Sequence, residues 1–63
     1  METTAHADLR INQRNLDRKV IATAMKTMES ILSGKELKFT FDNITIVAKK
    51  ENNVPVVITA WPK

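Results

Sequence analysis

Residues 37–61, LKFTFDNITIVAKKENNVPVVITAW, decide the fold of this chain. Apolar and polar residues alternate from 37 to 41, which is typical of a β-strand with one buried face. The pair Asp42-Asn43 tolerates the positive φ angles of a two-residue hairpin turn, and the polar residues 50–53 supply a second turn. Three strands that follow one another through short hairpins form an antiparallel meander.

The second and third strands continue this pattern. In the second strand, Ile44, Ile46 and Ala48 point one way, and Thr45, Val47 and Lys49 point the other. The third strand runs from Val54 or Pro55 to Trp61. Since Pro55 has no N–H to donate, it belongs at the start of a strand or on an open edge. We expect Trp61 to cover the open end of a small core, with stacking on a nucleic-acid base as the alternative.

Before this stretch the apolar period is close to 3.6 residues, which predicts helices. A helix over about residues 17–33, with Asp17 as its N-cap, presents one apolar stripe, and Gly34 stands where a left-handed C-cap is expected. The stripe consists of Val20, Ile21, Ala24, Met28, Ile31 and Leu32. Met25 and Met28 are expected to fill the core.

A shorter helix covers about residues 3–14, with Thr3 or Thr4 as its N-cap. Asn15 readily takes a left-handed backbone conformation, so a tight turn at this point should separate the two helices. The predicted fold is therefore one α+β domain over residues 1–63, in the order α-α-β-β-β. Both helices should cover one face of the three-stranded antiparallel sheet.

The composition narrows the class of protein. A chain of 63 residues holds one domain with a marginal core, so a protein partner or a homodimer would be in keeping with its size. With no cysteine and one histidine, it has no disulfide and no Cys/His set for structural zinc. It shows neither a signal-peptide pattern nor an apolar run of the roughly 20 residues that span a bilayer. We expect a cytoplasmic protein without a membrane segment or a cofactor.

Basic residues gather near the N-terminus, and the net charge is +3. The cluster consists of Arg10, Arg14, Arg18 and Lys19, whereas the acidic residues are scattered. This distribution favours a phosphate-bearing ligand such as RNA, with Arg18 among the binding candidates. A solvated helix face is the alternative interpretation.

If the first helix forms, His6, Arg10 and Gln13 share one face, with Arg14 close beside them. Arginine binds phosphate oxygens bidentately and stabilises transition-state charge, while histidine transfers protons near neutral pH. This set suits metal-free phosphodiester chemistry on RNA, which carries its own nucleophile. The alternatives are structural roles: a surface histidine, polar residues that solvate a turn, and Thr59 as an ordinary strand residue.

Other enzyme signatures are missing from the sequence. It contains no paired acids spaced for glycosidase chemistry, no glycine-rich phosphate loop and no nucleophile elbow. Most enzyme classes are therefore excluded.

Two segments carry a family resemblance: His6-Ala7-x-x-Arg10-x-x-Gln13-Arg14-Asn15-Leu16 and the closing Val56-Val57-Ile58-Thr59-Ala60-Trp61. They resemble small bacterial and phage domains that are grouped with the barnase, EndoU, colicin and RelE-like ribonuclease superfamily. That superfamily includes toxins and commonly has a four-stranded sheet. The resemblance implies His6 as the proton-transfer residue and Arg10 and Arg14 as phosphate-binding, charge-stabilising residues. It also implies Gln13 as an orienting donor and Thr59 as a hydroxyl at the site.

The leading hypothesis is a metal-independent ribonuclease of toxin-like, phage or mobile-element origin, which cleaves RNA by 2′-hydroxyl attack and leaves a cyclic phosphate. A cognate antitoxin would then be a protein partner. The alternative is a catalytically inactive module that binds a protein through the same scaffold, as a phage-encoded inhibitor or regulator would. A third hypothesis is nucleic-acid binding without cleavage.

Overall fold

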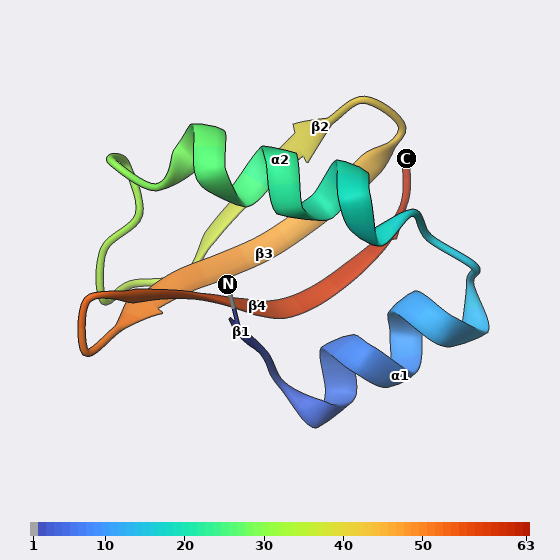
Figure 1. The fold of residues 1–63 in the computed structure, drawn as a ribbon, viewed down its shortest axis with the longest axis horizontal. Helices are drawn as coiled ribbons and strands as arrows, with labels where there is room; N and C mark the ends of the chain where they lie inside the picture. The colour runs from blue at the N-terminus through green and yellow to red at the C-terminus, as the bar shows by residue number, and fades with distance from the viewer. Residues whose placement is uncertain (1) are drawn as a thin grey trace.

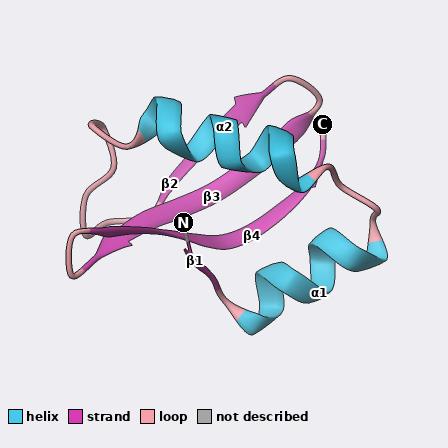
Figure 2. Ribbon diagram, in the orientation of Figure 1, coloured by secondary structure: helices cyan, strands magenta, loops and turns pink. Residues whose placement is uncertain are grey.

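The computed structural model describes residues 2–63, which form two helices and one four-stranded sheet (Figure 1, Figure 2). The elements in chain order are β1 (Glu2–Thr3), α1 (Ala5–Gln13), α2 (Arg18–Met28), β2 (Leu37–Phe41), β3 (Ile44–Glu51) and β4 (Val54–Pro62). The strands lie in the order β1-β4-β3-β2. In Figure 1, α2 crosses one face of the sheet, and α1 lies beside β4.

The predicted three-stranded antiparallel meander is wrong, because the chain adds a fourth strand near its N-terminus. β1 pairs with β4 in parallel, with Glu2 opposite Val56 and Thr3 opposite Val57, so the sheet is mixed. The pairs β2–β3 and β3–β4 are antiparallel, as expected. A strand of two residues is too short to show an alternation, and its partner lies near the other end of the sequence. No local pattern could therefore reveal it.

Thr4 connects β1, α1 and β4. Its N–H donates to the Val57 carbonyl at 3.1 Å, and its hydroxyl donates to the Ile58 carbonyl at 3.0 Å. The same hydroxyl accepts the Ala7 N–H at 3.0 Å, which makes Thr4 the N-cap of α1, one of the two candidates predicted. The beginning of α1 is therefore held on β4.

Left-handed backbone conformations mark the turns of the chain. The residues with positive φ are Asn15 at 53°, Asp42 at 54°, Asn52 at 50° and Asn53 at 66°. All are Asn or Asp, the non-glycine residues that tolerate this region best. The turn at Asn15 and both hairpin turns are thus confirmed, and Asp17 is the N-cap of α2, as predicted.

The predicted end of the second helix is wrong, because α2 ends at Met28 rather than near Ser33. The N–H groups of Ile31 and Leu32 both donate to the Met28 carbonyl, at 2.9 and 3.1 Å, so a tight turn closes the helix early. Leu32 returns to the core, whereas Ile31, expected in the apolar stripe, is 61% exposed. Gly34 lies well beyond the helix end and has no positive φ, so it is not the expected C-cap.

One hydrophobic core joins both helices to the sheet. It consists of Ala7, Ile11, Ile21, Ala24, Met25, Leu32, Ile44, Ile46, Ala48, Val57 and Ala60. Met25 is buried, and Met28 packs against the core, as predicted. The alternation in β2 is confirmed as well, because Leu37, Phe39 and Phe41 pack against the same cluster. Buried side chains of α1 and α2 therefore face the same side of the sheet.

Candidate functional site

An open hollow of ≈ 290 Å³ lies between α1 and the second half of β4. It is lined by His6, Arg10, Arg14, Thr59, Ala60 and Trp61. The first three belong to α1 and its C-cap, and the last three belong to β4. The fold thus brings together four of the six residues selected from the sequence, although they come from opposite ends of the chain.

The rows of side chains on α1 explain which residues reach the hollow. Residues four apart lie one above the other on a helix. Ala7 and Ile11 form the buried row and are 0% and 2% exposed. His6, Arg10 and Arg14 form the row on one side of it. The Arg14 N–H still donates to the Arg10 carbonyl at 3.0 Å and so continues the helical turn. The basic row therefore borders the core along its whole length.

The remaining rows of α1 point elsewhere. Asp8 and Asn12 lie on the other side of the buried row, about 200° around the helix from His6 and Arg10. Gln13 belongs to the same row as Leu9. The Leu9 side chain is 53% exposed, so this row points away from the core. Gln13 is exposed and does not line the hollow.

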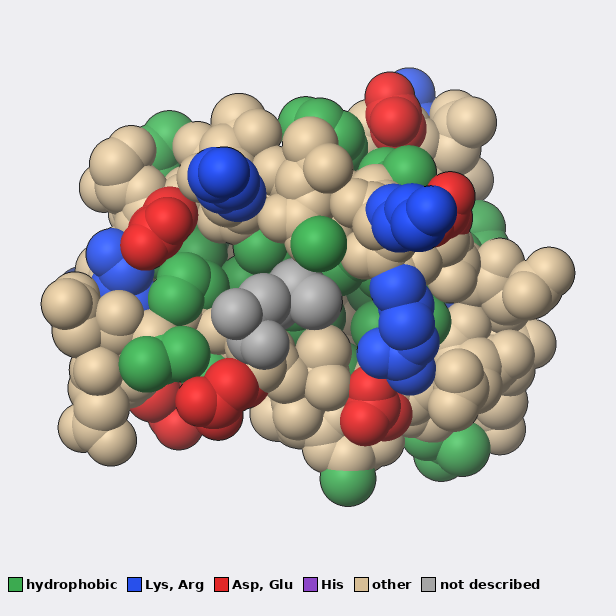
Figure 3. All heavy atoms as spheres, viewed as in Figure 1, with side chains coloured by type: hydrophobic (Ala, Val, Ile, Leu, Met, Phe, Trp, Pro, Cys, Tyr) green, Lys and Arg blue, Asp and Glu red, His purple; other side chains and the backbone are tan. Residues whose placement is uncertain are grey.

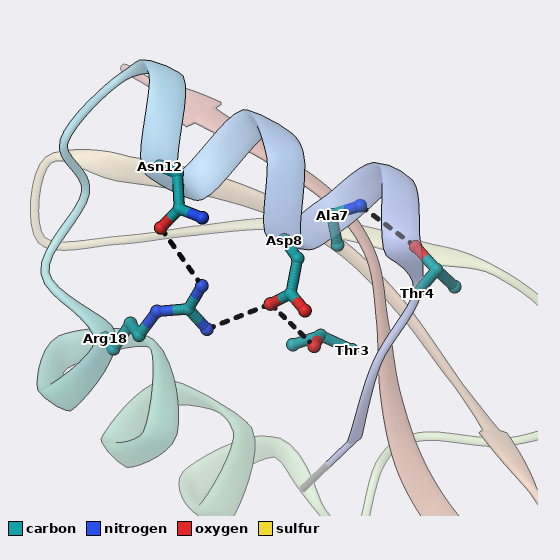
Figure 4. A network of polar contacts seen from close by, with 6 residues as sticks. All are labelled: Thr3, Thr4, Ala7, Asp8, Asn12 and Arg18. Carbon is teal, nitrogen blue, oxygen red and sulfur yellow. Dashed lines mark hydrogen bonds and ion pairs between the residues drawn. The ribbon is translucent and has the colours of Figure 1, made fainter.

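Arg18 contacts the row of Asp8 and Asn12, as Figure 4 shows. Its Nη1 lies 3.0 Å from Asp8 Oδ1, and its Nη2 donates to Asn12 Oδ1 at 3.3 Å. The Thr3 hydroxyl donates to the same carboxylate oxygen of Asp8 at 3.0 Å. Arg18 therefore ties the first turn of α2 to α1 and does not line the hollow, although it is close to Arg14 in the sequence.

The Asp8 contacts should make stability depend on pH. The hydrogen bond from Thr3, followed by that from Arg18, lowers the pKa of Asp8 below its usual value of 3.8. Because the folded-state pKa is the lower one, ionised Asp8 stabilises the fold above about pH 4, and this contribution is lost as the pH falls through the lowered pKa. We expect Asp8→Asn to be less stable than the wild type at neutral pH, with the difference shrinking in acid. Urea denaturation at a series of pH values measures this, and a difference that stays constant down to about pH 2 would contradict it.

A β-bulge at Ile58 sets the direction of the β4 side chains. Val57 and Thr59 pair with adjacent residues of β3, so Ile58 is an extra residue between them. With strict alternation from the buried Val57, Thr59 and Trp61 would face the core. Because of the extra residue, Ala60 faces the core instead and is 1% exposed. Thr59 and Trp61 lie on the opposite face of the sheet. The bulge thereby brings Thr59 to the hollow.

Trp61 does not cover the open end of the core, as the sequence had led us to expect. It lies outside the core cluster, is half-buried, and lines the hollow. The Nζ of Lys38 on β2 lies 5.6 Å from the centroid of its ring. The sequence had indicated a contact of Trp61 with a ligand as the alternative role only, and Lys38 was not among the candidates. The spacing of Thr59 and Trp61, two apart on one strand, was the available signal that they share a face.

The lining of the hollow is basic. One imidazole and two guanidiniums reach it, and no carboxylate is found among the described residues that line it. By contrast, the face that carries α2 shows Lys and Arg side chains interspersed with Asp and Glu, and no histidine is visible there (Figure 3). An anionic group is therefore the ligand that the charge of the hollow favours.

A larger hollow of ≈ 340 Å³ lies between α2 and the beginning of β4. It is lined by Ala22, Met25, Lys26, Glu29 and Pro55. Its surface is mostly apolar, and its two charged residues have opposite signs. Without a convergent set of polar groups, it is a weaker candidate than the hollow beside α1, despite its size.

Within residues 2–63, no group of three or more His, Cys, Asp or Glu side chains is placed to hold a metal ion. Over the same range, neither helix is long and apolar enough to cross a membrane. Comparison with known proteins found no matching family model, no matching curated protein and no matching solved structure.

Proposed function

We propose that this chain is a metal-independent ribonuclease of the toxin or phage-accessory type, which cleaves RNA by 2′-hydroxyl attack on the adjacent phosphodiester. The observation that carries the proposal is that His6, Arg10, Arg14 and Thr59 line one hollow. Together they supply a proton-transfer group, two fixed cations and a hydroxyl. These are the groups that metal-free transfer of a phosphodiester requires.

His6 carries the proton transfer in this mechanism. Its side chain is exposed at the hollow, so RNA can reach it. The neutral imidazole accepts the 2′-hydroxyl proton while the 2′-oxygen attacks phosphorus and the bond from phosphorus to the 5′-oxygen breaks. The imidazolium then returns this proton to the departing 5′-oxygen. The products are a 2′,3′-cyclic phosphate and a 5′-hydroxyl, and no water is consumed.

Arg10 and Arg14 bind the phosphate. Guanidinium groups donate to the non-bridging oxygens bidentately, and they stabilise the additional negative charge on those oxygens as the 2′-oxygen attacks. The Thr59 hydroxyl, on the opposite wall of the hollow, donates to the same group. A divalent cation would meet two guanidiniums and no carboxylate in this lining, so the hollow disfavours a metal-assisted route.

The sequence resemblance supports the same reaction. It assigns proton transfer to His6 and phosphate binding to the two arginines, the residues that share the lining with Thr59. The sheet of this chain has four strands, the number that is common in the ribonuclease superfamily.

The test is cleavage of RNA by the purified protein in the presence of EDTA. We expect cleavage, a 2′,3′-cyclic phosphate at the new end, and no cleavage of the corresponding DNA, which lacks the nucleophile. Activity that disappears with EDTA and returns with Mg²⁺ would contradict metal independence. Intact RNA under all conditions would contradict catalysis.

Two arginines provide a matched control for this test. Arg10 lines the hollow, whereas Arg18 is bound to Asp8 outside it. Removal of a preorganised cation at developing charge lowers kcat by about 10²-fold or more, so we expect a loss of this size for Arg10→Ala. Arg18→Ala should retain the wild-type rate at a temperature where it stays folded. Equal losses would indicate that overall charge, and not the hollow, matters.

A second candidate function is binding of a protein partner without catalysis. The observation that favours it is that β2 forms an outer edge of the described sheet, and an edge strand can pair with a strand of another chain. The chain itself would then act as an inhibitor or regulator of the protein that it binds. This function replaces the first if overexpression is harmless, RNA stays intact, and the protein captures one stoichiometric partner.

A further inference from the structure

Trp61 connects the hollow to the face of the sheet opposite the core cluster. On that face Trp61 lies in register with Thr45 and Thr40, and Thr59 lies in register with Val47 and Lys38. Trp61 therefore lines the hollow on one side, while Lys38, two strands away, reaches its ring.

The Trp61 side chain is not part of the hydrophobic core. The neighbouring Ala60 is 1% exposed and belongs to the core, so the Trp61 side chain lies on the opposite face of β4. The buried residues of both helices belong to the core cluster, so the helices pack against the other face. The aromatic ring is thus only partly buried, and it lies beside the two guanidiniums of the hollow.

Lys38 and Lys49 make different side-chain contacts on this face of the sheet. Lys49, on the same face of the sheet, is paired with Glu51 at 2.8 Å. The ammonium of Lys38 instead lies over Trp61, a contact at an exposed position that is weak enough to be exchanged for a phosphate. The face therefore presents an aromatic ring between two sources of positive charge, the arginines of the hollow and Lys38.

We propose that the hollow acts on single-stranded RNA, with the base next to the scissile phosphate stacked on Trp61 and the following phosphate bound by Lys38. This inference rests on the proposed function of the hollow. An aromatic platform beside a basic groove is the general means of binding unpaired nucleotides, because every base has a π-face. The bases of a duplex are already stacked and paired, so a duplex cannot present one to the Trp61 ring.

The experiment uses the intrinsic fluorescence of the protein, because Trp61 is its one tryptophan. The wild type is titrated with short 2′-fluoro oligonucleotides, which cannot be cleaved since they lack the 2′-hydroxyl. We expect a single-stranded oligonucleotide to quench the emission saturably and the matching duplex to leave it almost unchanged. Equal quenching by the duplex, or binding of the single strand without quenching, would overturn the inference.

Substitutions of Trp61 and Lys38 test the stacking contact and the phosphate contact separately. Trp61→Ala should weaken binding of a fluorescein-labelled single strand about tenfold, as expected for one lost stack, and Trp61→Phe should recover part of this affinity. Lys38→Gln should reduce the slope of log K against log salt by about 0.7, one phosphate contact on a single strand. Lys26→Gln on α2, on the other side of the molecule, is the control and should change neither quantity. No change in slope for Lys38→Gln would overturn its role.

The two proposals can fail separately. Saturable quenching without any cleavage of natural RNA would contradict the ribonuclease and leave the stacking site standing. Cleavage of natural RNA without quenching would contradict the stacking site and leave the ribonuclease standing.

Discussion

His6→Ala is expected to lower the rate of RNA cleavage by about 10²- to 10⁴-fold, the usual contribution of a general acid or base. The other groups of the hollow stay in place, so binding of RNA should change little. His6 is exposed on α1, and alanine is the better helix former, so the fold should be retained. Single-turnover cleavage of a labelled RNA measures the rate, and circular dichroism checks the fold.

The control for this experiment is Leu9→Ala. Leu9 is also exposed on α1, but its row points away from the hollow. It should cleave RNA at the wild-type rate. Wild-type cleavage by His6→Ala would remove His6 from the mechanism, and a loss of RNA binding as large as the loss of rate would make it a binding residue instead.

Ile11→Ala is expected to have the largest effect on stability. Ile11 is 2% exposed and belongs to the buried row that holds α1 on the sheet. Truncation of a buried isoleucine costs about 2–5 kcal/mol, a large part of the roughly 5–15 kcal/mol that stabilises a typical domain. The midpoint of urea unfolding should therefore fall steeply, and cleavage should fall with the folded fraction.

Leu9→Ala serves as the control here as well, since an exposed position should change the free energy of unfolding by no more than about 0.5 kcal/mol. A cost for Ile11→Ala that is no larger than that for Leu9→Ala would contradict the assignment of α1 to the core. A fully stable Ile11→Ala variant without activity would indicate that α1 reorients rather than unfolds.

The parts of the fold that could be predicted are those with a local pattern. Alternation located β2, β3 and β4, and the helical period located α1 and α2. The positive φ of Asn15 followed from its residue type together with its place between the two helical patterns. β1 and the end of α2 could not be predicted, because the first depends on a pairing across the chain and the second on a turn that closes over Met28.

The candidate site also has one part that the sequence predicts and another part that it does not. The spacing of His6 and Arg10 predicts that they share a side of α1, whatever the rest of the chain does. Their approach to Thr59 depends on the Thr4 hydrogen bonds and on the bulge at Ile58, which have no signature in one sequence. Arg18 was grouped with the other arginines because they are neighbours in the chain. The turn before α2 separates them in space.

The pairing of β1 with β4 has a consequence for the newly made protein. Residues 2–4 bind residues 56–58, so almost the whole sequence must be synthesised before the contact can form. Such distant contacts form late, because a long loop must close before they provide any stabilisation. On the ribosome, His6 and the arginines therefore emerge long before Thr59 and Trp61. The hollow is completed only once β4 has left the exit tunnel, so its lining residues come together after most of the domain has been synthesised.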